Sequence, residues 1–365
     1  MKVKGIVNLV LAMLWLSATV LIGGTNSTTL SYALTSIPSP APTVSEEVSW
    51  KMGDTLVAAT ITRPDDEAIH PAVVFVAGSG PTDRDWVSPL LYGKNGSARL
   101  LAEEFAKAGY VTIRYDKRIA GPNAQNNLPL MMGKISMEGH VDELAGAVDA
   151  LIARPDVNPD KIFVLANSEG ALHALNYQRT REPKFAGLIL SAMPGRGMTD
   201  LLHGQLEAQV ASLPNARDIM AGYDKLMADY LAGKPFVADP KIPKGFNDLV
   251  KGFHAPVNLP FAREFLSLDP AQLLKTVTAP ILVIIGKKDI QVDPLLDGIP
   301  LETAAKGLDN IRFVYPENAD HVLKYELNPR EELTGAAAAK TYNAPDRILD
   351  PGTLQVIKNW LEKNG

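Results

Sequence analysis

Short apolar runs recur along the chain, and between them apolar residues return at helical spacing. The runs are rich in β-branched side chains, which is typical of strands that are buried on both faces of a sheet. They occupy residues 72–77, 110–115, 162–165, 185–192, 279–285 and 311–315. We therefore predict that these segments form the centre of a buried sheet.

The stretches that separate or follow these runs predict amphipathic helices, at residues 97–107, 137–153, 171–180 and 354–363. Apolar strands that alternate with helices indicate a parallel sheet with helices on both faces. Two further strands are predicted at residues 48–51 and 56–62, joined by a turn at Gly53 and Asp54. The predicted fold class is α/β, with a mostly parallel, doubly wound sheet and an antiparallel edge.

The alternation stops between residues 194 and 278. This segment contains no comparable apolar run, but it has helical patterns at residues 198–212 and 216–231. An insertion of this kind between two strands predicts a helical cap that shapes a pocket above the sheet. The core domain is then formed by residues 46–193 and 279–365.

Residues 1–33 have the pattern of a signal peptide. Two lysines precede an apolar run at residues 6–22, and residues 31–33 offer a small-x-small cleavage site. The apolar run is nearly long enough to cross a bilayer, so an uncleaved membrane anchor is the alternative. Residues 34–45 contain three prolines and predict an extended linker. The expected location is exported, either periplasmic or extracellular.

Composition narrows the classes of partner. The 365 residues include no cysteine, so the protein has neither disulfides nor a lipobox anchor. The formal net charge of −5 does not indicate binding to nucleic acid or to an anionic membrane surface. A stable membrane partner is expected only if the N-terminal segment stays uncleaved, and the sequence does not indicate an oligomeric state.

Ser168 lies between the apolar run at residues 162–165 and the helix predicted from residue 171. Small residues, Ala166 and Gly170, stand two positions before and after it. A strand that reverses sharply into a helix leaves room only for small side chains at these positions, and it holds the residue at the apex exposed and strained. A serine that merely caps the helix is the alternative.

The run Ala166-Asn167-Ser168-Glu169-Gly170 resembles the Gly-x-Ser-x-Gly nucleophile elbow of the α/β-hydrolase family, with alanine in place of the first glycine. Residues 77–85 resemble the His-Gly-Ser-Gly-Pro-x-Asp-Arg-Asp loop of a bacterial serine esterase branch of that family, with Ala77 in place of histidine. The resemblance implies an α/β-hydrolase fold and an oxyanion hole formed by the N–H groups of Ser79 and Glu169. A tight Gly-Pro loop without a catalytic role is the alternative.

Ser168, Asp289 and His321 each follow a predicted strand, in the order serine, acid, histidine that this family uses. The carboxyl ends of parallel strands meet at one edge of a sheet, so these side chains are expected to lie together. Of the six histidines, only His321 follows the last strand. Asp289 competes with Asp293 and Asp320, and the family's Gly-x-x-Asp pattern favours Asp289.

A second group of charged residues lies near the same edge of the predicted sheet. Residues 116–118 resemble the family's Asp-x-Arg-Gly turn, with Ile119 in place of the glycine. We predict a structural ion-pair cluster beneath the site, formed by Arg84, Asp85, Asp116 and Arg118.

These features predict a serine hydrolase that cleaves small carboxylic esters through an acyl-enzyme on Ser168, with His321 as base and Asp289 as the acid that orients it. The expected partner is a small-molecule ester. No cofactor is implied, and no metal-binding pattern is present. A peptidase or thioesterase of the same fold remains open, as does a non-catalytic hydrolase-like binding protein.

Overall fold

The computed structural model describes residues 42–89, 93–333, 342–344 and 346–365. The predicted signal peptide at residues 1–33 lies outside the described residues, as does the predicted linker up to residue 41. Within the described ranges, no helix is long and apolar enough to cross a membrane.

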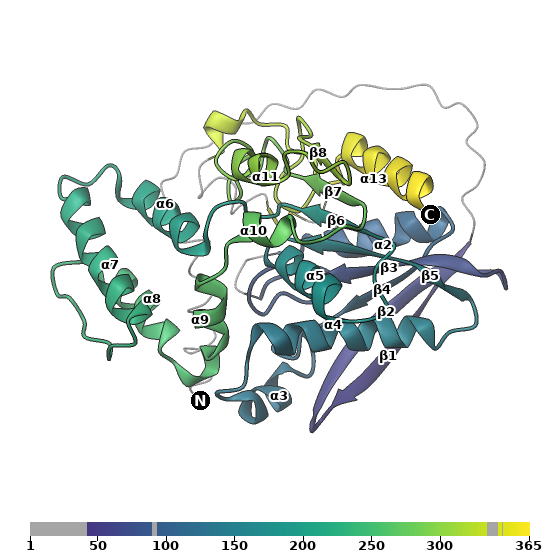
Figure 1. The fold of residues 1–365 in the computed structure, drawn as a ribbon, viewed down its shortest axis with the longest axis horizontal. Coiled ribbons are helices and arrows are strands. Elements are labelled where there is room, and N and C mark those ends of the chain that lie inside the picture. Colours follow the sequence, from purple (N-terminus) through teal and green to yellow (C-terminus); the bar gives the residue numbers. More distant parts are fainter. Residues whose placement is uncertain (1–41, 90–92, 334–341, 345) are drawn as a thin grey trace.

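Eight strands form one sheet in the order β1-β2-β4-β3-β5-β6-β7-β8 (Figure 1). The pairs β1/β2 and β2/β4 are antiparallel, and all the other pairs are parallel. The strands are β1 (Thr43–Met52), β2 (Thr55–Pro64), β3 (His70–Val76), β4 (Val111–Tyr115), β5 (Val157–Asn167), β6 (Gly187–Ser191), β7 (Ile281–Ile284) and β8 (Ile311–Val314). The predicted α/β class with a mostly parallel sheet is confirmed.

Helices cover both faces of this sheet. They are α2 (Ser97–Lys107), α3 (Ala124–Met131), α4 (Met137–Ile152), α5 (Glu169–Thr180), α6 (Met198–Val210), α7 (Ala216–Leu231), α8 (Lys244–Phe253), α9 (Phe261–Leu266), α10 (Pro270–Leu274), α11 (Gly298–Ala304) and α13 (Pro351–Asn364). Two 3-10 helices, η1 (Pro256–Asn258) and η2 (Arg330–Glu332), complete the described elements.

The side chains of β3 show why its sequence is apolar from Ala72 to Val76. Val74 and Val76 belong to the core shared with α4 and α5, whereas Val73 and Phe75 belong to the core shared with α2 and α13. Successive side chains of a strand point to opposite faces, so a strand that is covered on both sides favours apolar residues at every position. The apolar runs of the sequence therefore result from burial on both faces of the sheet.

The first strand begins earlier than the sequence predicted. Strand β1 starts at Thr43, so the last three residues of the predicted linker lie in the sheet. Thr43 pairs with Pro64 and Ser45 pairs with Thr62. Backbone pairing with β2 therefore extends the strand beyond its apolar part, which a hydrophobic pattern cannot indicate.

Helices α6 to α10 lie between β6 and β7 in the chain, and the segment from residue 192 to residue 280 adds no strand to the sheet. Figure 1 shows α6, α7, α8 and α9 to one side of the sheet. Their buried apolar residues belong to the same core as those of α4 and α5. We call residues 192–280 the helical insertion.

Candidate active site

Ser168 forms the sharp turn between β5 and α5. Its backbone has φ 55° and ψ −124°, a conformation that side-chain-bearing residues rarely adopt. The Ser168 N–H donates to the carbonyl oxygen of Ser191 at 2.8 Å, and the Ser168 carbonyl accepts from the N–H of Ala171 at 3.0 Å. These bonds tie the strained turn to β6 and to the first turn of α5.

The residues around this turn are packed too closely for larger side chains. A Cβ atom on Gly170 would lie 2.7 Å from the carbonyl oxygen of Ala77, and one on Gly78 would lie 3.2 Å from Cβ of Ser168. The position of Ala166 differs, because it lies within β5 and pairs with Val76 of β3. Glycine is therefore required two residues after Ser168, whereas alanine can be accommodated two residues before it.

His321 and Asp289 are hydrogen-bonded to each other. Nδ1 of His321 lies 2.9 Å from Oδ2 of Asp289, and both side chains are buried. The other carboxylate oxygen of Asp289 accepts from the N–H groups of Gln291 at 2.8 Å and Val292 at 3.0 Å. A carboxylate accepts hydrogen bonds only. Nδ1 of His321 then carries the hydrogen, and Nε2 is left free to accept a proton.

The other two candidate acids are engaged elsewhere. Asp293 forms an ion pair with Arg330, and its Oδ1 accepts from the N–H groups of Leu295 and Leu296. Asp320 forms an ion pair with Arg347 at 2.6 Å. Of the three predicted acids, the structure brings only Asp289 into contact with the His321 ring.

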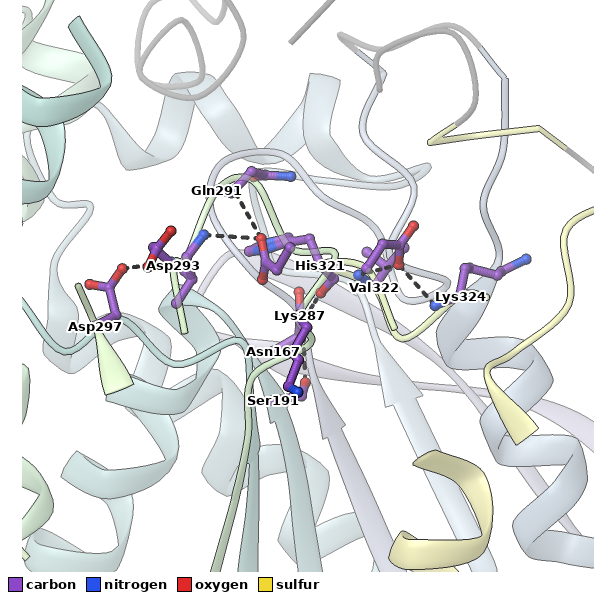
Figure 2. A network of polar contacts seen from close by, with 12 residues as sticks. Asn167, Ser191, Lys287, Gln291, Asp293, Asp297, His321, Val322 and Lys324 are labelled. Atoms are coloured by element: carbon purple, nitrogen blue, oxygen red, sulfur yellow. Dashed lines mark hydrogen bonds and ion pairs between the residues drawn. The ribbon is translucent and has the colours of Figure 1, made fainter. Parts of the chain in front are cut away.

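Asn167 connects the serine turn to the histidine loop. Its Nδ2 donates to the carbonyl oxygen of His321 at 2.9 Å and to Oγ of Ser191 at 3.2 Å. Figure 2 shows Asn167 between these two residues. The residue before Ser168 therefore fixes the backbone that carries His321.

Ser168 and His321 line the same pocket, which has about 530 Å³ of empty space, part of it open to solvent. Within the described residues, no hydrogen bond joins the two side chains. The rest of the pocket wall is mainly apolar and comes from the insertion and the sheet edge: Pro194, Met198, Leu201, Leu202, Gln205, Phe265 and Val292. The helical insertion therefore forms much of the wall that faces the serine.

The two predicted oxyanion donors lie at this pocket as well. Ser79 and Glu169 both line it, and neither backbone N–H has a protein acceptor in the part of the chain that the structure describes. Glu169 is the first residue of α5, where N–H groups have no partner within the helix. Two free amides beside a serine can stabilise a negatively charged oxygen.

The start of the insertion is anchored to the loop that follows β7. Asp297 is buried and accepts from Nε of Arg196 at 3.0 Å, from Nη2 of the same guanidinium at 2.9 Å and from the N–H of Gly195 at 3.1 Å. It also accepts from the N–H of Asp293 at 2.8 Å, a contact visible in Figure 2. One carboxylate thus holds the insertion against the segment that carries Asp289.

The model of the alpha/beta hydrolase family matches residues 73–334, which include every residue of the candidate site. The chain belongs to the alpha/beta hydrolase family.

This alpha/beta hydrolase is also similar to individual proteins. Esterase EstD of Thermotoga maritima is 25% identical to it over 305 residues, which are 83% of this chain and 65% of the esterase. Among solved structures, a hypothetical protein from Pseudomonas aeruginosa has a TM-score of 0.51 at 18% identity, covering 92% of this chain and 100% of that one. Pyrococcus horikoshii acylaminoacyl peptidase has a TM-score of 0.50 at 14% identity, covering 88% of this chain and 41% of that one. These two structures show the fold that the hydrolase shares with them.

A buried ion pair beneath the site was not predicted from the sequence. Nζ of Lys117 donates to the carbonyl oxygen of Gly78 and lies 3.3 Å from Oε1 of Glu169. The same carboxylate oxygen lies 3.1 Å from Nε2 of His173. Burial alone would raise the pKa of Glu169, but the Lys117 charge and the bond to His173 outweigh it and hold that pKa well below its usual range. The pair joins the loop that follows β3 to the first turn of α5.

The predicted charge cluster is only partly correct. Arg84 pairs with Asp116 at 2.8 Å, and Asp85 lies beside Arg114. The prediction that Arg118 joins this cluster was wrong, because its guanidinium pairs with the buried Glu143 of α4 at 2.8 Å. The turn after β4 therefore places Arg118 against α4, whereas Asp116 contacts Arg84.

Replacing Lys117 with methionine should lower the free energy of unfolding by about 3 to 5 kcal/mol, because it leaves the buried Glu169 carboxylate without its counter-charge. The matched control is Lys287→Met, which removes an exposed pair with Glu317 and should cost less than about 1 kcal/mol. Urea unfolding of both variants measures the difference. Equal losses of unfolding free energy in the two variants would mean that the buried ion pair stabilises this hydrolase no more than the exposed one does.

Acid should destabilise the hydrolase from about pH 6.5 downwards. Burial lowers the pKa of His173 to about 4, although its hydrogen bond to Glu169 acts in the opposite direction. The unfolded chain protonates this histidine near pH 6.5, so between these two values the unfolded state binds more protons and stability falls as the pH falls. The loss should be on the order of 3 kcal/mol, the free energy that separates a pKa near 6.5 in the unfolded chain from one of about 4 in the folded protein.

A second loss follows at lower pH. Burial raises the pKa of Glu143, but His140 and Arg118 outweigh it and bring the pKa to about 2. Its contribution is complete above the unfolded value of 4.5 and is lost as the pH falls towards 2. Urea unfolding between pH 7 and pH 4 tests the loss of stability that is assigned to His173. The variant His173→Gln should remove most of this pH dependence. His203→Gln, on the partly exposed side of α6, should leave it unchanged.

Proposed function

We propose that this protein hydrolyses small carboxylic esters through an acyl-enzyme on Ser168. His321 is the general base, Asp289 holds its imidazole in one tautomer, and the N–H groups of Ser79 and Glu169 bind the oxyanion. Family membership and the likeness to an esterase support hydrolase activity. The observation that carries the proposal is the His321–Asp289 hydrogen bond beside a pocket that Ser168 also lines.

The reaction begins when Nε2 of His321 takes the proton of the Ser168 hydroxyl and the serine oxygen bonds to the ester carbonyl carbon. The carbonyl π electrons move to oxygen, which lies between the two free amides. As the tetrahedral intermediate collapses, the bond to the alcohol oxygen breaks and His321 donates its proton to that oxygen. Water, deprotonated by the same imidazole, then cleaves the acyl-enzyme and restores the serine.

The pocket supports a small ester as substrate. Its walls are mostly apolar, as in most small-molecule sites. Met198, Leu201 and Phe265 provide surface for an alkyl or aryl group. Within this pocket the described residues place no ionisable side chain other than those of Glu169 and His321, so the wall favours uncharged substrates.

The purified protein should be labelled by a fluorophosphonate and should turn over p-nitrophenyl acetate with a larger kcat/KM than an aminoacyl p-nitroanilide or an acetyl thioester. The ester is favoured over the anilide because nitrophenolate leaves without the protonation that an amine requires. Release of nitrophenol, nitroaniline or thiol at matched substrate concentrations measures all three. A larger kcat/KM for the anilide or the thioester would identify a peptidase or thioesterase, and absence of labelling would identify a binding protein.

A further inference from the structure

The peptide group between Gly78 and Ser79 supplies one of the two proposed oxyanion donors. Its N–H belongs to Ser79, and its carbonyl oxygen belongs to Gly78. This peptide is trans, so the carbonyl and the N–H lie in one plane and point in opposite directions. The group that holds the carbonyl oxygen of Gly78 therefore also sets the direction of the Ser79 N–H.

Lys117 holds this carbonyl oxygen. Its Nζ lies 2.5 Å from the oxygen, and no other group in the described ranges donates to it. The lysine is buried and reaches the loop after β3 from the turn that follows β4. A charged donor forms a shorter and stronger hydrogen bond than a neutral one. The Ser79 N–H is then directed away from Lys117, and Ser79 lines the pocket that Ser168 also lines.

Glycine at position 78 does not restrain this peptide by itself. A Cβ atom there would lie 3.2 Å from Cβ of Ser168 and 3.3 Å from the carbonyl oxygen of Asn167, so the close approach to the serine turn favours glycine. Glycine has the fewest steric limits on its backbone angles, so the peptide that follows it rotates at little cost. The hydrogen bond from Lys117 supplies the restraint that a side chain gives elsewhere.

The rest of the loop after β3 is held independently of Lys117. Asp116 accepts from the backbone N–H of Arg84 at 2.8 Å and forms an ion pair with its guanidinium at 2.8 Å. The hydroxyl of Thr82 donates to the carbonyl oxygen of Ser79 at 2.7 Å. Loss of the Lys117 bond should therefore release the one peptide that it holds and leave the rest of the loop in place.

Lys117 also contacts the residue that supplies the second proposed donor. Its Nζ lies 3.3 Å from Oε1 of Glu169, whose backbone N–H is at the start of α5 beside Ser168. Both donors must lie within hydrogen-bond distance of one oxygen for the two to bind it together. A single ammonium group that contacts both the loop and the helix holds the two donors at that separation.

We infer that Lys117 is a positioning residue for ester hydrolysis, because it holds the Gly78–Ser79 peptide with the Ser79 N–H turned towards the oxyanion. Lys117 has this role only within the proposed function, so the inference rests on that function. The lysine does not line the pocket itself. It acts on the transition state, since the carbonyl oxygen of a bound ester becomes negatively charged only there.

Lys117→Met should lower kcat for p-nitrophenyl acetate by about 10- to 100-fold per folded molecule and should change KM by less than about threefold. The loss is smaller than the roughly 10²- to 10³-fold effect of removing a donor outright, because the variant frees the Ser79 N–H to rotate and does not delete it. Urea unfolding gives the folded fraction of each preparation.

The matched control is Arg118→Met, at the next residue of the same turn. It also deprives a buried carboxylate, that of Glu143, of its guanidinium partner. Arg118 makes no hydrogen bond to the loop after β3 among the residues that the structure describes. Its kcat per folded molecule should therefore stay within about threefold of the unsubstituted protein.

Two ketones distinguish oxyanion binding from a change in the shape of the pocket. Phenethyl trifluoromethyl ketone adds to a reactive serine and carries an oxyanion in the adduct, whereas phenethyl methyl ketone binds without one. Lys117→Met should raise the Ki of the trifluoromethyl ketone by about the factor by which it lowers kcat/KM. It should raise the Ki of the methyl ketone by less than about threefold.

A second variant separates this role from stability. Lys117→Met/Glu169→Met removes both buried charges, so it should regain most of the unfolding free energy that the single variant loses. Neither methionine donates to the carbonyl oxygen of Gly78, so kcat should stay about 10- to 100-fold low. The double variant also carries the test if the single variant does not fold.

The outcomes separate this inference from the proposed function. If the unsubstituted protein hydrolyses the ester but Lys117→Met has the same kcat per folded molecule as Arg118→Met, the inference is wrong while ester hydrolysis stands. Equal weakening of both ketones, or recovery of kcat in the double variant, also overturns it. If the unsubstituted protein neither turns over an ester nor is labelled by a fluorophosphonate, the proposed function fails and the inference fails with it.

Discussion

Replacing Ser168 with alanine should reduce kcat for ester hydrolysis by about 10⁶-fold, the size of effect seen when the serine of a Ser-His-Asp site is removed. The variant has no oxygen at Cβ, so no acyl-enzyme forms, while the pocket and the free amides of Ser79 and Glu169 are retained. Fluorophosphonate labelling should disappear together with turnover. Active-site labelling and p-nitrophenyl acetate hydrolysis measure both effects.

The fold should survive this substitution. Alanine is as strained as serine at φ 55°, and the Oγ of Ser168 makes no hydrogen bond within the described residues, so the free energy of unfolding should change by less than about 0.5 kcal/mol. Ser267→Ala is the matched control, because Ser267 lies on the exposed side of the insertion and bonds only to the carbonyl oxygen of Arg263. If Ser168→Ala still labels and still turns over ester, another nucleophile is responsible.

The sheet was predictable because its strands are buried on both faces. In β3 and β7 every residue between Ala72 and Val76 and between Ile281 and Ile284 is apolar, so burial is visible in the sequence directly. Strand β5 was predicted only from residue 162, although it begins at Val157. Its first residues include Pro159 and Asp160, and its start is fixed by the pairing of Val157 with His70 of β3, which the hydrophobic pattern does not record.

The meeting of Asp289 and His321 was predictable for a topological reason. These residues follow β7 and β8, which are parallel neighbours in the sheet, so the loops at their carboxyl ends lie side by side. Ser168 follows β5, which is separated from β7 only by β6. The order of strands along the chain was enough to bring the three loops to one edge.

The polar network behind the site was not predictable from the same patterns. Lys117 contacts Gly78 and Glu169, which are 39 and 52 residues away in the chain, and no local spacing connects them. Glu143 and His140 lie on α4, where helical periodicity assigns charged residues to solvent, yet both are buried. Their burial depends on Arg118 and on the ring of His173, which are brought to α4 by the fold.

Asp289→Asn should lower kcat by about 10⁴-fold, because it changes the tautomer of the His321 ring. The asparagine oxygen is expected to keep the position of Oδ1, where it accepts from the N–H groups of Gln291 and Val292. Its NH₂ group then replaces Oδ2 and donates to Nδ1 of His321, so the ring hydrogen moves to Nε2. Nε2 can no longer take the Ser168 proton, although the geometry is preserved.

The other acid of the same loop provides the comparison for this effect. Asp293→Asn weakens the pair with Arg330 but leaves the His321 ring with its carboxylate, so kcat/KM should change by no more than about twofold, or about 0.5 kcal/mol. Measuring kcat for p-nitrophenyl acetate in both variants, with urea unfolding to confirm that each is folded, separates orientation of the base from general loss of structure. Equal kcat values for the two variants would remove Asp289 from the proposed mechanism. They would mean that Asp289, like Asp293, stabilises the loop but does not act on the chemical step.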